Sequence, residues 1–168
     1  MSIIKTRKAI LPYRPCVGIM LINRKGRVFV GRRINSEESG GWQMPQGGIE
    51  DGEDPKTAAM RELKEEIGTD KAEIIGQSSG WPTYDLPDHL VGKVWKGRYR
   101  GQKQKWFVMR FVGDDTDIKL DDHDHPEFSA YRWVPIDQLP ALVVEFKVPV
   151  YELLVAEFQH LVEQAGRG

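Results

Sequence analysis

The stretch AAMRELKEEIG, residues 58–68, decides the fold of this chain because it combines an apolar stripe with three crowded acids. Ala59, Met60, Leu63 and Ile67 recur at the spacing of one helix face. A helix with such a stripe packs one side against a core and leaves the other side exposed. The stretch therefore predicts an amphipathic helix on the surface of a folded domain.

The residues on either side set the ends of this helix. Asp54 is a favourable N-cap residue, and Pro55 fits the first helical position, where its missing N–H is not needed. Gly68 follows the last apolar position and is a favourable helix stop. We therefore expect the helix to begin at Pro55 and to end near Gly68.

The three acids lie on one side of the stripe. At 100° per residue from Leu63, Glu66 lies about 60° away, Glu62 about 100° and Glu65 about 160°, all in the same direction. Two carboxylates about 4 Å apart repel by roughly 4 kcal/mol at an effective dielectric constant near 20. The acids either form a solvated face balanced by neighbouring basic residues, or share a bound cation.

The composition is that of an ordinary water-soluble protein. The chain has 168 residues, of which 40% are hydrophobic and 29% charged, with a net charge of −1. No run approaches the roughly 18 apolar residues of a membrane span, and the single Cys16 excludes an internal disulfide framework. We expect one domain over residues 1–168, a cytoplasmic location and no membrane partner, with a monomer favoured.

Alternating segments predict an α/β fold with a mixed sheet between helices. The glycine-rich stretch GGWQMPQGGIEDGEDP, residues 40–55, is expected to be a long shaped loop, and a final helix is expected from Pro149. The expected strands are residues 16–23, 27–33, 72–77, 105–113 and 129–136.

The upstream spacing favours the shared cation. From Gly47 the chain reads G-x5-E-x7-R-E-L-x-E-E-x-G over residues 47–68. This pattern resembles the signature box of the Nudix hydrolases, which cleave a nucleoside diphosphate linked to another group and fold as an α/β/α sandwich. Thr69 departs from the pattern, because the family expects an aliphatic residue there, but that position packs and does no chemistry.

The resemblance assigns roles within and beyond the box. It implies that Glu62 and Glu66 are the main metal ligands, that Glu65 is a ligand or a base, and that the Gly47 carbonyl adds a ligand. An all-oxygen donor set suits Mg²⁺ or Mn²⁺. Such ions orient a polyphosphate and lower the pKa of the water that attacks phosphorus. Outside the box, Glu127 matches the glutamate of a PEF motif that supplies a further carboxylate.

The remaining charged pair of the box has a structural role by the same resemblance. Glu53 and Arg61 are expected to pair and to brace the loop against the helix.

The flanking motifs narrow the resemblance to one branch. They resemble the bacterial RNA pyrophosphohydrolases, which are similar to the dinucleoside polyphosphate hydrolases of bacteria and plants. The likeness runs from about residue 13 to residue 158. The motifs that carry it are GRR at 31–33, GWQMPQGG at 41–48, GQKQKWF at 101–107, PEF at 126–128 and RWV at 132–134.

A basic and aromatic segment fits a substrate that carries nucleobases. Residues 93–110 contain seven cations and no acid, and Trp95, Tyr99 and Trp106 are interleaved with them. Cations for phosphates and aromatic planes for bases are typical of single-stranded nucleotide sites. The alternative is a solvated basic hairpin with Trp106 in the core.

The resemblance implies further substrate contacts. Arg14 and Arg33 would contact phosphates or the terminal nucleotide, and Phe146 with Lys147 would flank a base, unless Phe146 is a core residue at the helix entrance. The GQKQKWF motif adds two more candidates, Lys103 and Lys105.

The resulting hypothesis is a hydrolase that removes pyrophosphate from the 5′ end of triphosphorylated RNA and leaves a 5′ monophosphate. The main alternative is hydrolysis of diadenosine tetra- or pentaphosphate to give ATP. A nucleotide-binding module without turnover would be expected to have lost acids of the box, and all of them are present. A hydrolase of damaged nucleoside triphosphates would not need the flanking motifs.

Overall fold

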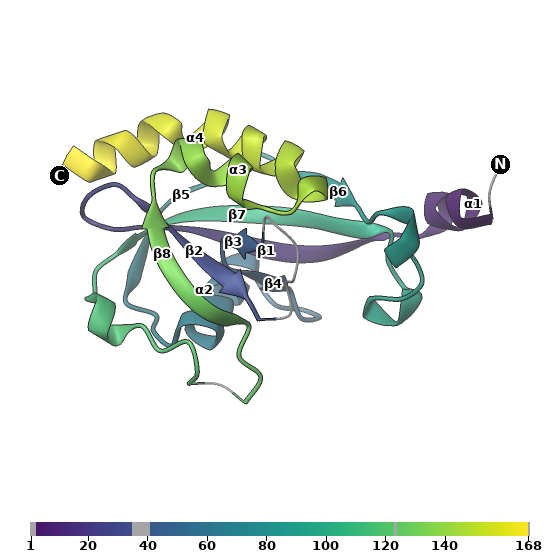
Figure 1. Ribbon diagram of the computed structural model, residues 1–168, viewed down its shortest axis with the longest axis horizontal. Helices are drawn as coiled ribbons and strands as arrows, with labels where there is room; N and C mark the ends of the chain where they lie inside the picture. Colours follow the sequence, from purple (N-terminus) through teal and green to yellow (C-terminus); the bar gives the residue numbers. More distant parts are fainter. Residues whose placement is uncertain (1–2, 35–40, 123, 168) are drawn as a thin grey trace.

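A mixed sheet runs through the protein, with helices on both of its faces (Figure 1). The computed structural model describes residues 3–34, 41–122 and 124–167. Within that part the strands are β1 (Tyr13–Ile22), β2 (Val28–Arg33), β3 (Trp42–Gln43), β4 (Gln46–Gly48), β5 (Ala72–Gln77), β6 (Thr83–Asp85), β7 (Gly101–Phe111) and β8 (Phe128–Val134).

Four α-helices and five short 3-10 turns complete the described part of the chain. The α-helices are α1 (Ile3–Ile10), α2 (Pro55–Ile67), α3 (Leu139–Leu142) and α4 (Val148–Arg167). The 3-10 turns are η1 (Asp88–Leu90), η2 (Trp95–Gly97), η3 (Asp115–Asp117), η4 (Ile136–Gln138) and η5 (Glu145–Lys147). None of the helices in these ranges is both long enough and apolar enough to cross a membrane.

The sheet is built around the parallel pair β1 and β7. Their register runs from Tyr13 opposite Gly101 to Ile22 opposite Arg110. Along its other edge, β1 pairs with β2 only near Ile22 and with β4 at Cys16–Gly18. The second edge of β7 is likewise shared by two strands, β5 and β6. The pairing partners of β1 and β7 therefore change toward the N-terminal ends of these two strands. The sheet opens there and leaves space for a site.

Each face of the sheet carries its own hydrophobic core. On one face, Trp106 and Val108 of β7 belong to a core shared with α4. On the other, Phe107 and Met109 belong to a core shared with α2. Successive side chains of a strand point to opposite faces, so one strand serves both cores. This arrangement confirms the α/β/α sandwich.

The ends of α2 follow the prediction. The Asp54 side chain accepts a hydrogen bond from the Lys56 N–H at 3.1 Å, and Pro55 opens the helix. Gly68 ends it in the left-handed conformation, with φ of 82°. Thr69 is buried, as expected of a packing position.

The structure contains several elements that were not expected, among them β6, α3 and the two described next. The glycine-rich stretch is not only a loop, because it contains β3 and β4, and β4 pairs its backbone with β1. Gly47 and Gly48 carry no side-chain pattern that marks a strand, so the pairing follows from the tertiary fold. The helix α1 was not expected either, since its eight residues are too few for a clear periodic signal.

A tight contact between the two central strands gives a first prediction. A Cβ atom on Gly18 would lie 2.5 Å from ring atoms of the fully buried Trp106. Gly18→Ala should therefore lower the free energy of unfolding by about 1–3 kcal/mol, as overpacking does. Urea denaturation measures this change. In Gly80→Ala, where a Cβ meets nothing within 4 Å, the change should stay within about 0.5 kcal/mol; equal effects of the two substitutions would contradict the prediction.

Candidate active site

A cavity of about 380 Å³ opens where the sheet splits, between the strands and the start of α4. It collects residues from β1, β2, β4, α2, β6, β7 and η5. Eight of the predicted site residues line it, namely Arg14, Arg33, Gly47, Glu62, Glu66, Glu127, Phe146 and Lys147.

Glu66 is the most enclosed acid of this cavity. Its residue is 7% exposed, and its Oε2 accepts a hydrogen bond from the Gln46 N–H at 3.2 Å. Burial raises the pKa of this carboxyl well above its usual range, and the nearby Glu62 and Glu127 carboxylates raise it further. These surroundings disfavour the charged form of the carboxyl, and a bound cation would offset that penalty.

Glu62 lies directly against the backbone of Gly47. A Cβ atom on Gly47 would lie 2.0 Å from the Glu62 carboxyl carbon, so only glycine fits this position. Burial raises the pKa of Glu62, while the Arg61 guanidinium, 2.9 Å from its Oε1, acts in the opposite direction. The Glu62 carboxylate therefore lies against the Cα of Gly47, and both residues line the cavity.

Arg61 ties the glycine-rich stretch to α2. Its Nε and Nη2 donate to the two carboxylate oxygens of Glu53, both at 2.9 Å, and Nη2 also donates to the Gly48 carbonyl at 2.9 Å. Such a two-pronged ion pair fixes direction as well as distance. The guanidinium and the Glu50 N–H together lower the pKa of Glu53 to about 2.

Glu65 lies apart from the other two box acids. It is exposed and does not line the cavity, and its Oε2 is 3.3 Å from the Arg61 Nη1. Exposure increases from buried Glu66 to exposed Glu65, in the order of their angles from the apolar stripe of the helix. The role of Glu65 as ligand or base stays a prediction.

The chemistry of the donor groups fits a hard divalent cation. The oxygens available are the carboxylates of Glu62, Glu66 and Glu127 with the Gly47 carbonyl, and Mg²⁺ or Mn²⁺ prefer such oxygens. In the described ranges, no three acids, histidines or cysteines lie close enough together to hold one ion as placed. The fit therefore rests on the donor set and on the raised pKa values of the half-buried Glu62 and the buried Glu66.

The opposite wall supplies a buried cation and two aromatic rings. The Lys147 Nζ donates to the Gln43 Oε1 at 3.1 Å and lies 5.6 Å and 6.0 Å from the ring centroids of Tyr84 and Phe146. Burial and the nearby Arg33 lower the pKa of Lys147 to about 8, against the opposing effect of the cavity acids. Phe146 is half-buried, so it packs on the α4-side core and also faces the cavity.

Lys103 and Lys105 do not line the cavity. On β7 they alternate with the buried Gln102 and Gln104, so they point to the other face of the sheet. Lys103 lies over the Trp81 ring at 5.9 Å, and Lys105 donates to the Ser78 carbonyl. Their contact with substrate stays a prediction.

A row of buried glutamines was missed by the sequence analysis. The Gln104 Nε2 donates to the side-chain oxygens of Gln46 and Gln102, both at 2.8 Å, and its own Oε1 accepts from the Trp106 indole at 3.0 Å. Gln46 and Gln102 both line the cavity. The alternation of Gln102 and Gln104 with two lysines just before an apolar run is the signal that would have pointed to two of them.

The cavity also has an apolar wall that the sequence analysis did not assign. It is formed by Leu86, Leu90, Val94 and Trp95.

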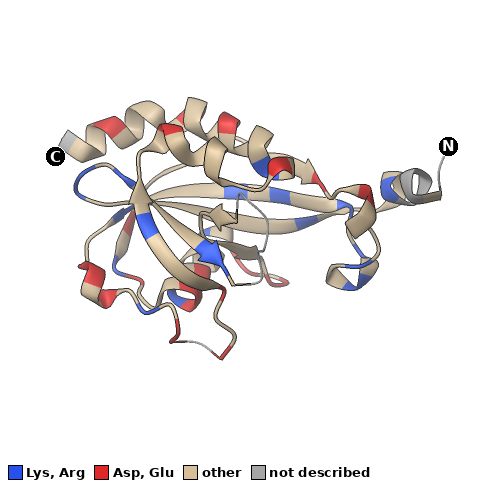
Figure 2. Ribbon diagram, in the orientation of Figure 1, with Lys and Arg blue, Asp and Glu red and all other residues tan. Residues whose placement is uncertain are grey.

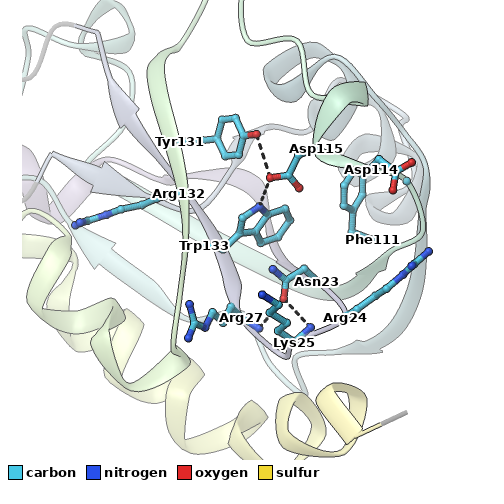
Figure 3. Close-up of a pocket in the computed structure, with 11 residues that line it drawn as sticks. Asn23, Arg24, Lys25, Arg27, Phe111, Asp114, Asp115, Tyr131, Arg132 and Trp133 are labelled. Atoms are coloured by element: carbon cyan, nitrogen blue, oxygen red, sulfur yellow. Dashed lines mark hydrogen bonds between the residues drawn. The ribbon is translucent and has the colours of Figure 1, made fainter.

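A second cavity, of about 650 Å³, lies where β1 turns into β2 (Figure 3). The Tyr131 hydroxyl and the Trp133 indole N–H both donate to the Asp115 carboxylate there, at 3.3 Å and 3.2 Å. No predicted site residue lines this cavity. The close-up also shows the Asn23 side chain, whose oxygen accepts from the backbone N–H groups of Lys25 and Arg27.

Comparisons with known proteins identify the family of the chain. A family model described as the NUDIX domain matches residues 12–154. The RNA pyrophosphohydrolase of Novosphingobium aromaticivorans is 58% identical over 154 residues, which cover 90% of this chain and 96% of that protein. The RNA pyrophosphohydrolase of Rhodospirillum rubrum is 60% identical over 147 residues, or 88% of this chain and 87% of that protein.

Solved structures show the same fold at lower identity. The dihydroneopterin triphosphate pyrophosphohydrolase of E. coli superposes with a TM-score of 0.66 at 22% identity, covering 87% of this chain and 99% of that one. The sequence relatives thus confirm the branch that the flanking motifs indicated, and the structural neighbour confirms the fold.

The Glu53–Arg61 pair predicts a pH effect on stability. The pKa of Glu53 in the folded protein is about 2, below the usual 4.5. The ionised carboxylate therefore stabilises the fold above pH 4.5, and this stabilisation is lost as the pH falls toward 2. Glu53→Gln should therefore lower the Tm clearly at pH 6 and less at pH 3. Thermal unfolding at the two pH values measures this, with the exposed Glu73→Gln as control. The same loss of Tm at both pH values would contradict the prediction.

Proposed function

Because the chain belongs to the Nudix family, we propose that it removes pyrophosphate from the 5′ end of triphosphorylated RNA. The observation that carries this proposal is the cavity that unites box acids, three cations and three aromatic rings. The names of its relatives, RNA pyrophosphohydrolases at 58% and 60% identity, support the same substrate. Water attacks phosphorus, one anhydride bond breaks, and the RNA keeps a 5′ monophosphate.

The acids of the cavity would hold the divalent cation on which Nudix hydrolases generally depend. Glu62 and Glu66 would bind it, with the Gly47 carbonyl and Glu127 as further ligands. Mg²⁺ is the cation we propose, with Mn²⁺ as the substitute. When bound, the cation neutralises phosphate charge and makes the attacking water more acidic. Arg61 keeps Glu62 turned toward the Gly47 backbone, where both oxygens can serve the same ion.

The cations and rings of the cavity would bind and orient the substrate. Positive charge around the phosphates would come from Arg14, Arg33 and Lys147. These preorganised cations would take the place of the water that otherwise solvates the phosphates. Phe146 would stack on a base beside Lys147. On grounds of composition, we also propose that residues 1–168 form one domain and that the protein is monomeric and cytoplasmic.

A comparison of two substrates tests the function. We expect kcat/KM with Mg²⁺ to be clearly higher for a short triphosphorylated RNA with an unpaired 5′ end than for diadenosine tetraphosphate. Both substrates need acids, cations and stacking planes, so the cavity alone does not separate them. The opposite preference would make the protein a dinucleoside polyphosphate hydrolase, and turnover of neither would overturn the proposal.

The buried acid predicts the effect of a nearly isosteric change. Glu66→Gln should reduce kcat at least tenfold on triphosphorylated RNA and leave the Tm unlowered, because it removes a ligand charge and also relieves charge repulsion in the cavity. The control is Glu152→Gln, an exposed position on α4 that should keep wild-type turnover. Activity of Glu66→Gln above a tenth of wild type would remove Glu66 from the ligand set.

A further inference from the structure

The apolar wall of the cavity belongs to an ordered loop, residues 86–100, called here the 86–100 loop. Its two ends meet, because the Leu86 N–H donates to the Arg100 carbonyl at 2.8 Å and Arg100 forms an ion pair with Asp85 at 3.0 Å. Lys8 of α1 fastens the start of the loop by donating to the Leu86 carbonyl at 2.7 Å. Compact loops closed in this way are often functional.

The loop places one large ring at the cavity in a strained conformation. Trp95 has φ of 50° and Lys96 has φ of 58°, both in the left-handed region that bulky residues avoid. These are the only positive φ values among the non-glycine residues of the described part of the chain. Strain of this kind persists where the surrounding structure fixes it, and it concentrates at ligand-binding sites.

Trp95 is linked to the metal-binding acids through one cation. A Cβ atom on Gly48 would lie 2.4 Å from the Arg14 Nη2, so the Arg14 guanidinium rests against the backbone next to Gly47. The same guanidinium lies over the Trp95 ring, 5.5 Å from its centroid. The indole therefore follows the acids and Arg14 along the cavity, and the cation beside it differs from Lys147, which lies beside Phe146.

The outer side of the loop is basic. Lys93, Lys96 and Arg98 are exposed, and Figure 2 shows blue segments on this loop at the end of the molecule near α1. An aromatic plane with cations beside it is the combination that single-stranded nucleic acids bind. A core role for Trp95 explains its packing but neither the strained backbone nor the Arg14 contact.

We propose that Trp95 is a second base-stacking position of the active site, which takes a nucleobase of single-stranded RNA other than the one that Phe146 takes. This inference rests on the proposed function, since it assigns part of the same cavity to the same substrate. It makes Trp95 a residue that binds substrate, and it predicts that more than one nucleotide of the RNA must be unpaired.

The first test uses the reaction. Trp95→Ala should raise KM for a triphosphorylated tetranucleotide about tenfold, within the range of lost base stacking, and change kcat less than twofold. Trp95→Phe, which keeps a smaller aromatic face, should restore most of the loss. An unchanged KM, or a fall in kcat of the same size as the rise in KM, would overturn the proposal, because the second result is that of a distorted cavity.

The second test needs no turnover. A 5′-monophosphorylated tetranucleotide, which has no anhydride bond, should quench the tryptophan fluorescence of the wild type as a base stacks on the indole. Trp95→Phe should remove that quenching while the RNA still binds, and Trp133→Phe, in the other cavity, should retain it. Undiminished quenching in Trp95→Phe would overturn the inference. Absence of cleavage by the wild type would instead overturn the proposed function, and this binding test would still decide the role of Trp95.

Discussion

The active site depends on the contacts of one guanidinium group, that of Arg61. It holds Glu53 at the end of the glycine-rich stretch, the Gly48 carbonyl in its strand, and Glu62 on the helix, each at 2.9 Å. A planar group with five donors can satisfy all three partners at once, whereas an ammonium group cannot offer the same fork. Strand β4 and helix α2 therefore keep a fixed separation, and the cavity acids take their positions from it.

The titratable groups Glu66 and Lys147 lie in surroundings that disfavour their charged forms. Burial raises the pKa of Glu66 and lowers that of Lys147, so each group is less ready to carry charge than it would be in water. A ligand that brings both a divalent cation and several phosphates supplies an opposite charge to each group. This is consistent with our proposal that the cavity takes a metal polyphosphate as a whole, more than either part alone.

The sequence predicted those features that depend on neighbours along the chain. The caps of α2 at Asp54 and Gly68, its buried stripe and the order of exposure of its three acids all follow from local spacing. The box and its flanking motifs gave the family, and eight of the predicted site residues meet in one cavity.

Features that depend on distant pairing were not predicted. Strand β4 exists because two glycines lie alongside β1, and Lys103 turns away from the cavity because β7 begins at Gly101, four residues before the predicted strand. Neither leaves a local pattern. Trp95 was visible only as one of several aromatic residues, since its place on the cavity wall depends on how the 86–100 loop closes.

The parallel pairing of β1 with β7 has a consequence for how the protein is made. Tyr13 lies opposite Gly101, so strands separated by more than half of the chain must meet before Arg14 and Gln102 share a wall. Contacts between residues so distant in sequence form slowly, because a long loop must close first. During synthesis, the box helix can form as soon as its own residues are free, but the cavity cannot exist until β7 has emerged. A growing chain is thus unable to act on the RNA around it, and catalytic competence arises only in a late step of folding.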